Sequence, residues 1–403
     1  MSWKGVTVMD QKIRFIAEYL KGYFPFSELC FQFSISRKTG YKWIHRYEDQ
    51  GIEGLNNRST RPVNCPHKTD PAIIEAIVHA RIKHPSWGPK KLLQILSPKY
   101  KDLPAISTTA DILTRNGLII PRKRRLRHRH PGCPKTTTNG PNDIWTADYK
   151  GHFKMGNQHY CYPLTVCDMH SRYLLGCEGH DAISLEQTKR HFTKLFNEYG
   201  LPVRIRTDNG VPFASNAIAR LSMLSVWWIK LGIYPEQIEP GKPQQNGKHE
   251  RMHRTLKKEA TIPPEKNLAS QQKRFDAFRI EYNTERPHEA LGMKRPASVY
   301  VASPRTMPKK LEHFDYPAHF EVRLVSKNHC IRWKNHYVPV SSTLVKEYIG
   351  FEEVDDGIYN TYFCGLLIGR FFEKDFRIKD VIGRIPVRHT KVECCNPKMR
   401  RKV

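Results

Sequence analysis

Three acidic residues stand in sequence contexts that could support chemistry on phosphate esters. Asp148 lies in IWTADYKGHF, Asp208 in VRIRTDNGVPF and Glu250 in PQQNGKHERMHRTLK. Short alternating apolar runs precede the two aspartates, which predicts a strand ending at each acid. Carboxylates can hold Mg²⁺, which prefers oxygen ligands, and two such ions about 3.5–4 Å apart can clamp the oxygens of a phosphoryl displacement. The three acids therefore predict a site for two Mg²⁺ ions, in which Mn²⁺ could substitute.

The third acid opens a segment with helical spacing. Glu250, Arg254 and Lys257 fall at i, i+4 and i+7, so they share one helix face. Arg254 and Lys257 could grip substrate phosphates beside the acids. An ordinary solvated helix face explains these two basic residues equally well.

The charge of the chain favours a polyanionic partner. The 403 residues carry a formal net charge of +28, and this length predicts two to four domains. A membrane is disfavoured because no apolar run approaches the ~18 residues of a spanning helix. The N-terminus shows no secretion signal, and the ten cysteines are scattered, which suits a reducing cytosol. We expect a cytoplasmic protein that binds nucleic acid.

Residues 1–58 are predicted to form a helix-turn-helix domain. Ser36 can cap a helix over 37–50, with an apolar side at Trp43 and an outward basic side at Arg37, Lys38 and Lys42. Such a helix fits a DNA major groove. Taken alone, a three-helix bundle with a solvated charged face would be the simpler interpretation. The downstream acids favour DNA binding.

A second helix-turn-helix domain, of winged-helix-like type, is predicted over 68–120. Asp70 can cap a helix that begins with Pro71, and Ser107 can cap another over 108–116. That last helix offers Thr108, Thr109 and Arg115 for groove contacts. A basic linker is expected over 121–140, and its basic run is predicted to follow DNA phosphates through Arg122, Lys123, Arg124, Arg125 and Arg127.

The middle of the chain predicts a mixed α/β core. Strands are expected over 143–149, 159–167, 172–179 and 203–207, with helices over 184–199 and 218–231. The motifs TADYKGHF, TVCDMHSRYLLG, RTDNGVPFAS, LSVWWIKLGI, PGKPQQNGKHERMHRTLK and YNTERPHEALGMKRPASVY lie in this region. On these motifs, residues 141–301 resemble the catalytic core of DDE transposases of the retroviral-integrase type from bacterial insertion sequences. The resemblance implies a ribonuclease-H-like fold.

The same resemblance assigns the acids. Asp148 matches the first catalytic aspartate, Asp208 the second and Glu250 the glutamate after PQQNG. Forty-one residues lie between Asp208 and Glu250, against about thirty-five in the family, and extra helical turns near LSVWWIKLGI could absorb the difference. Glu259 is the alternative third acid. Beyond the core we expect a small β-barrel over 315–385 and a basic tail over 386–403.

The resemblance implies a bacterial, nucleoid-associated transposase that binds double-stranded DNA. It would bind the terminal inverted repeats of its element, cleave DNA strands and transfer them to target DNA, working as a homodimer or higher oligomer. Two alternatives remain open. One is a catalytically silent, sequence-specific regulator, and the other is a ribonuclease-H-like nuclease acting on RNA–DNA hybrids.

Two other clusters are interpreted as structural. Cys161, Cys167 and Cys177 lack the spacing of a zinc site and fall within expected strands, so we predict small buried side chains. Trp227 and Trp228 are expected in the core rather than on a base-stacking surface.

Overall fold

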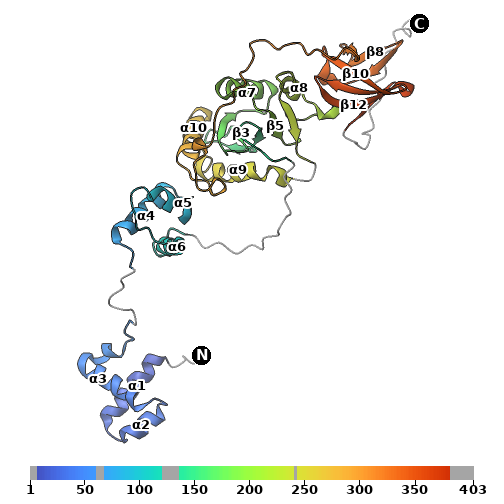
Figure 1. Ribbon diagram of the computed structural model, residues 1–403. Coiled ribbons are helices and arrows are strands. Elements are labelled where there is room, and N and C mark those ends of the chain that lie inside the picture. The colour runs from blue at the N-terminus through green and yellow to red at the C-terminus, as the bar shows by residue number, and fades with distance from the viewer. Residues whose placement is uncertain (1–6, 60–67, 120–135, 240–242, 382–403) are drawn as a thin grey trace. The chain divides into compact units, whose positions relative to one another are not determined.

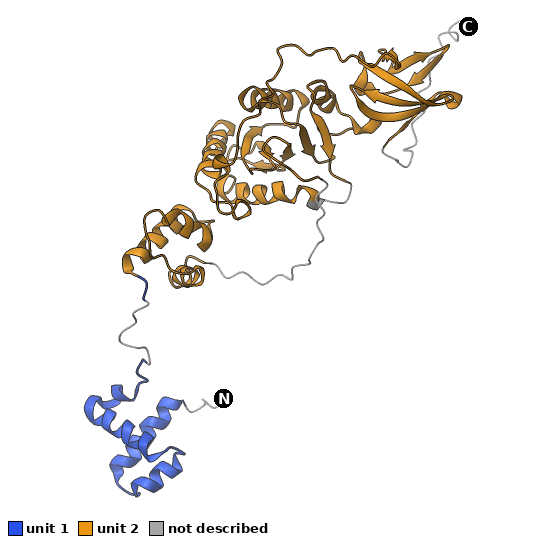
Figure 2. Ribbon diagram, viewed as in Figure 1, with its two compact units in different colours: residues 1–69 blue, residues 70–403 orange. Residues whose placement is uncertain are grey.

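The chain forms two compact units, residues 1–69 and 70–403 (Figure 2). The structure, a computed structural model, describes residues 7–59, 68–119, 136–239 and 243–381. The basic run at 122–127 therefore lies outside the described residues. Within the described residues, no helix is both long and apolar enough to cross a membrane.

The first unit is a bundle of three helices, α1 (Val8–Lys21), α2 (Phe26–Gln32) and α3 (Arg37–Gln50). Ser36 caps α3 as predicted, since its hydroxyl accepts a hydrogen bond from the Thr39 N–H at 3.2 Å. Trp43 is buried in the apolar core, with the Lys12 ammonium 3.8 Å from its ring centroid. The exposed side of α3 carries Arg37, Lys38 and Lys42.

The second unit begins with three more helices, α4 (Pro71–Lys83), α5 (Pro89–Leu96) and α6 (Ile106–Arg115). Asp70 caps α4 as predicted, and its carboxylate accepts from the Ala72 N–H at 2.8 Å. The prediction that Ser107 caps the last helix is wrong. α6 begins at Ile106 after Ala105, which places Ser107 inside the first turn.

A six-stranded mixed sheet forms the centre of the second unit (Figure 1). Its strands are β1 (Ile144–Tyr149), β2 (Phe153–Lys154), β3 (Tyr160–Asp168), β4 (Leu174–His180), β5 (Arg204–Thr207) and β6 (Tyr234–Gln237). The order is β2-β3-β1-β5-β6, with β4 paired to β3. β1 runs antiparallel to β3 and parallel to β5. This is the mixed sheet of a ribonuclease-H-like core, as predicted, although β2 and β6 were not foreseen.

Helices cover both faces of this sheet because side chains alternate along each strand. α7 (Leu185–Tyr199) and α8 (Met223–Lys230) pack on the face that carries Trp145, Leu164 and Ile205. α9 (Gly247–Ala260) and α10 (Leu268–Thr284) pack on the opposite face. The helix predicted over 218–231 is shorter than expected, since a capping box at Ser222 starts α8 at Met223.

Two predictions about core residues are confirmed. Cys161, Cys167 and Cys177 are free, buried and located in strands, and they contribute to the core under α9 and α10. Trp227 and Trp228 are buried between α8, α7 and the sheet.

The C-terminal region is an antiparallel sheet of β7 (Glu321–Leu324), β10 (Tyr348–Asp355), β11 (Ile358–Phe363), β12 (Leu366–Phe372) and β13 (Arg377–Asp380). Its order is β13-β12-β11-β10-β7, and β8 (Cys330–Trp333) and β9 (His336–Pro339) form a separate hairpin. Trp333, Phe351 and Phe371 meet in its core. The predicted barrel is therefore not closed by strand pairing within 321–380, where β7 and β13 remain the sheet edges.

Seven short 3₁₀ helices connect the elements of the described residues. They span Gly51–Leu55, Ile218–Arg220, Pro243–Asn246, Glu289–Leu291, Pro296–Ser298, Ser342–Leu344 and Glu373–Asp375.

A buried ion pair fixes β5 beside β6. Arg206 is fully buried, and its Nε donates to Glu236 Oε1 at 2.8 Å. We predict that Arg206→Met lowers the free energy of unfolding by about 3–5 kcal/mol, because it leaves the Glu236 charge buried without its partner. Urea denaturation of the full chain measures this loss.

Arg204→Met is the matched control on the same strand. Arg204 is half-buried, and its guanidinium lies 5.1 Å from the ring centroid of Tyr234. Its loss should cost only about 0.5–1 kcal/mol. Equal losses for the two variants would contradict a dominant role of the buried pair.

Candidate active site

Asp148 and Asp208 lie at the same edge of the sheet. β1 and β5 are parallel neighbours, and Ala147 is in register with Thr207, so the next residue of each chain segment is one of the two aspartates. Both side chains are half-buried. Asp208 Oδ1 accepts a hydrogen bond from the Gly210 N–H at 3.2 Å, which orients the carboxylate in the turn after β5. Two strands thus deliver two carboxylates to one place.

Glu250 lies on α9 and is close enough to Asp148 to affect its pKa. It lies in the first turn of the helix and is exposed, whereas its helix neighbours His249, Met252 and His253 are buried. A helix places residues three and four apart on one face, so Arg254 and Lys257 are exposed on the Glu250 side. The expected shared face of these three residues is present.

The surroundings of the two aspartates raise the pKa of both. Burial, the neighbouring Asp208 carboxylate and, more weakly, Glu250 raise the pKa of Asp148 to about 7, while Lys150 opposes the shift. Burial also raises the pKa of Asp208, against the hydrogen bond from Gly210. In the described residues, neither Asp208 nor Glu250 forms an ion pair with Lys or Arg. Such a cluster favours a bound cation.

Two histidines beneath Asp148 were missed by sequence analysis. His249 Nε2 and His253 Nε2 lie 2.7 Å and 2.6 Å from the hydroxyl of Thr165, the residue paired with Asp148 across β1 and β3. His249 Nδ1 lies 2.8 Å from the Thr146 hydroxyl. These contacts attach α9 to the sheet directly below the acids.

The histidine rings are neutral in this environment. Burial lowers the pKa of His249 to about 3. Burial, with smaller effects of His249 and Lys150, lowers the pKa of His253 to about 2. The spacing HERMH, with two histidines four residues apart around Glu250, was the available signal for an inward-facing pair.

Models of known protein families match several parts of the chain. Integrase core domain models match residues 138–243 and 231–296. A helix-turn-helix domain model matches 11–62, and a homeodomain-like model matches 39–113. The chain is an insertion-element transposase with an integrase core. Its integrase core places it in a family of catalytic enzymes, and its N-terminal part carries helix-turn-helix domains.

Individual relatives come from bacterial insertion elements. An uncharacterized 39.2 kDa protein of insertion element IS476 from Xanthomonas euvesicatoria is 27% identical over 259 residues, covering 63% of this chain and 72% of the relative. Transposase InsD for insertion element IS2D from Escherichia coli (strain K12) is 23% identical over 270 residues, covering 63% and 83%.

Solved structures with similar folds include two retroviral proteins. The simian T-cell lymphotropic virus intasome, in complex with a PP2A regulatory subunit, has a chain that is 15% identical and covers 77% of this transposase and 100% of that chain, with a TM-score of 0.37. The HTLV-2 integrase catalytic core domain in complex with magnesium is 16% identical, covering 41% and 100%, with a TM-score of 0.33.

Glu259, the alternative third acid, is engaged elsewhere in the transposase. Its Oε1 accepts from Arg286 Nη1 at 2.6 Å and from the Ser86 hydroxyl. The Arg286 guanidinium also lies 5.7 Å from the ring centroid of Trp87. Glu259 therefore links the core to the segment between α4 and α5. It is not among the carboxylates that raise the pKa of Asp148.

The proposed DNA-contact residues differ in exposure. Arg37, Lys38, Lys42, Thr108 and Arg115 are exposed. Thr109 is fully buried, and its hydroxyl donates to the Ala105 carbonyl at 3.0 Å, so the prediction that it contacts a groove is wrong. Arg122, Lys123, Arg124, Arg125 and Arg127 lie outside the described residues.

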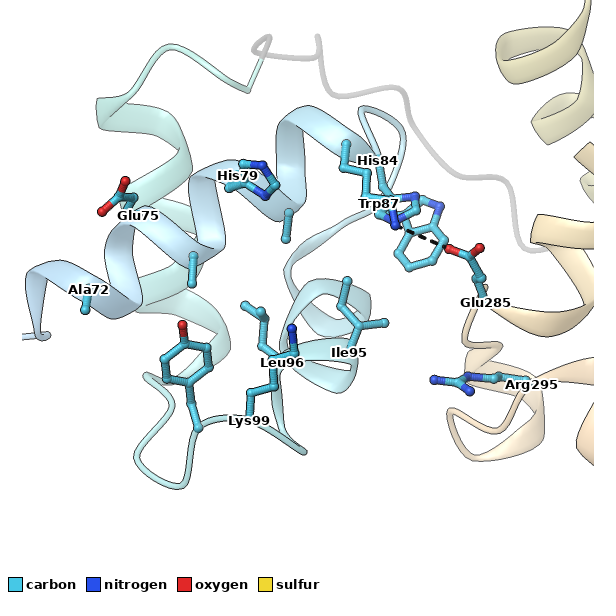
Figure 3. Close-up of a pocket in the computed structure, with 14 residues that line it drawn as sticks. Ala72, Glu75, His79, His84, Trp87, Ile95, Leu96, Lys99, Glu285 and Arg295 are labelled. Atoms are coloured by element: carbon cyan, nitrogen blue, oxygen red, sulfur yellow. Dashed lines mark ion pairs between the residues drawn. The ribbon is translucent and has the colours of Figure 1, made fainter. Parts of the chain in front are cut away.

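Two hollows lie in the second unit. One, of about 700 Å³, is lined by Asn209, Val211 and Pro212 directly after Asp208, together with residues around α8. The other, of about 660 Å³, lies among α4, α5, Glu285 and Arg295, and contains none of the three acids (Figure 3). A Lys83–Glu285 ion pair of 3.7 Å crosses its rim.

The contacts of Glu259 generate a stability prediction. Glu259→Gln should lower the free energy of unfolding by about 1–3 kcal/mol, because the largely buried Arg286 loses its charged partner. Thermal or urea unfolding of the full chain measures the change.

Glu285→Gln is the control for this measurement. Glu285 and Lys83 have side chains that are 50% and 64% exposed, so their pair should contribute less than about 1 kcal/mol. If Glu259→Gln were as stable as the natural protein, Glu259 would not have the structural role assigned to it.

Proposed function

We propose that this transposase binds the terminal repeats of its element and cleaves and joins DNA strands at Asp148, Asp208 and Glu250. The observation that carries the proposal is the register that sets Asp148 of β1 beside Asp208 after β5, with Glu250 in the first turn of α9 close enough to raise the pKa of Asp148. Burial and, after it, the charges of Asp208 and Glu250 raise the pKa of Asp148, and a bound cation would offset both effects.

The acids suit a pair of Mg²⁺ ions. Carboxylate oxygens are the ligands that Mg²⁺ prefers, and an electropositive partner would relieve the repulsion at this edge of the sheet. Asp148 and Asp208 would hold one ion, and Asp148 and Glu250 the other, with Mn²⁺ as a substitute. When bound, such ions activate the attacking oxygen and neutralise charge on the leaving oxygen of a phosphodiester.

The reaction would have two steps. Water first hydrolyses a phosphodiester at the element end and releases a 3′-hydroxyl. That hydroxyl then attacks a phosphodiester of target DNA, forming a new ester and displacing the target's own 3′ oxygen. The Thr165 hydroxyl beside Asp148 is fully buried and hydrogen-bonded, which favours water and DNA hydroxyls over that side chain as nucleophiles.

The remaining features are consistent with a double-stranded DNA substrate. The net charge of +28 favours a polyanion, and the hollow next to Asp208 could receive a strand beside the acids. Arg254 and Lys257, exposed on the Glu250 side of α9, could hold its phosphates. Because two element ends must be joined to one target, we propose a homodimer or higher oligomer on DNA.

The acids provide the direct test of this function. Asp148→Asn, Asp208→Asn and Glu250→Gln should each abolish nicking and joining of labelled element ends in Mg²⁺, because each removes a charge that the site needs. Binding to the same DNA should be nearly unchanged, since the helical units are untouched. Gel assays of cleavage and of binding separate the two properties.

Glu259→Gln serves as the control acid on the same helix. It should retain cleavage when assayed at a temperature where it remains folded. Full cleavage by Asp148→Asn or Asp208→Asn would refute the assignment, and would leave the silent-regulator and nuclease alternatives to be tested with DNA-binding and RNA–DNA hybrid substrates.

Sequence discrimination should reside in exposed residues of α3 and α6. Arg37→Ala should reduce the preference for element ends over random DNA by about 1–3 kcal/mol if it contacts a base, and Thr108→Ala should act in the same direction. Fluorescence anisotropy with both DNAs at one salt concentration measures this preference.

Each variant has a matched partner that should keep the preference. Arg14 is exposed on α1, outside the proposed recognition helix, and Thr109 is buried next to Thr108. Arg14→Ala and Thr109→Ala should therefore leave discrimination unchanged. If all four variants behaved alike, these helices would not select the site.

A further inference from the structure

His253 lies between the sheet and the first acid. Its Nε2 is 2.6 Å from the Thr165 hydroxyl, and its Nδ1 is 3.7 Å from Asp148 Oδ2. The ring is buried with 6% exposure, and the His249 ring meets it edge to face. Its two nitrogens therefore face a hydroxyl on one side and a carboxylate on the other.

One hydrogen-bond arrangement at Thr165 places a hydrogen on Nε2 of His253. The Thr165 hydroxyl has one hydrogen, which it donates to the Asp148 carbonyl oxygen at 3.0 Å. When the same oxygen accepts a hydrogen bond from the His253 ring, 2.6 Å away, Nε2 of that ring carries the hydrogen. In a neutral imidazole the other nitrogen has a lone pair. That nitrogen, Nδ1, lies 3.7 Å from the Asp148 carboxylate oxygen Oδ2.

Two acceptors thus face each other across 3.7 Å. A hydrogen bond between nitrogen and oxygen spans about 2.7–3.2 Å, so none joins these two atoms. Ligand atoms bound to one transition ion at about 2.0–2.2 Å each come within roughly 3–4 Å of one another. The 3.7 Å between His253 Nδ1 and Asp148 Oδ2 is therefore the separation expected of two ligands of one metal ion.

We propose that His253 is a nitrogen ligand of the cation that Asp148 holds. This inference rests on the proposed function, in which Asp148 is a metal ligand. Mg²⁺ prefers oxygen, whereas imidazole nitrogen suits divalent transition ions. One imidazole among the carboxylates therefore shifts the preference of that position toward an ion such as Mn²⁺.

His249 differs from His253 although both lie in one cluster with Asp148. Ligand atoms of the three residues fall within 4.8 Å of one another. However, both nitrogens of His249 already have partners, the hydroxyls of Thr146 and Thr165. His249 is thus a structural neighbour and a matched control.

The test is electron spin-echo spectroscopy of Mn²⁺ bound to the full chain. The natural protein should show coupling to an imidazole nitrogen, and labelling with ¹⁵N-histidine should shift its frequencies. His253→Asn should abolish this coupling and weaken Mn²⁺ binding relative to Mg²⁺ by roughly tenfold or more. His249→Asn should keep the coupling. Circular dichroism establishes that each variant is folded.

The outcomes separate this inference from the proposed function. Mn²⁺ that binds the natural protein, is lost in Asp148→Asn and shows no imidazole coupling would overturn the role of His253 and leave the acid site standing. Mn²⁺ binding that is unaffected by Asp148→Asn would overturn the proposed function itself. If His253→Asn fails to fold, the test compares the natural protein with His249→Asn. Coupling of Mn²⁺ to an imidazole nitrogen in both proteins supports His253 as the ligand. Absence of this coupling from either protein overturns the inference.

Discussion

The parallel pairing of β1 with β5, which sets Asp148 beside Asp208, is the constraint around which the core of this transposase is arranged. Asp148 and Asp208 occupy adjacent positions at the ends of parallel strands, and Glu250 approaches from a helix. Like charges in a partly buried site oppose the folded state unless other interactions hold them together. Backbone pairing of β1 with β5 holds the two aspartates, and it does not depend on their side chains. Contacts of α9 with the sheet hold the third acid.

Several buried polar side chains near the acids have hydrogen-bonded partners. Arg206 and Glu236 neutralise each other inside the sheet next to Asp208. At the opposite end of β3, the Asp168 carboxylate accepts from the Asn142 N–H at 2.8 Å and from the Ser171 N–H at 2.7 Å, which fixes the turn into β4. These hydrogen bonds and the Arg206–Glu236 ion pair hold the strands of the sheet in place. Asp148 and Asp208 lie at one edge of that sheet. Active sites commonly concentrate unfavourable interactions in this way.

Local patterns made much of this arrangement predictable. β1, β3, β4 and β5 follow from alternating apolar residues, and the acids follow from their places after strands. The features that were missed depend on distant partners. The inward role of His249 requires Thr165 on β3, and the burial of Thr109 requires the packing of α6 in its own bundle. Whether the C-terminal strands close into a barrel likewise depends on which strands pair at the edges of the sheet. Alternating apolar residues predict each strand but not its partner.

The attachment of α9 also explains how the unusual spacing between Asp208 and Glu250 is tolerated. A helix turns about 100° per residue, so a shift of one residue would move His253 away from Thr165 and Glu250 away from the aspartates. The contacts of His249 and His253 with Thr165 therefore fix both the rotation and the position of α9. β5 is fixed independently by its pairing with β1 and β6. With both ends held by the sheet, the forty-one intervening residues can vary in number without displacing the third acid.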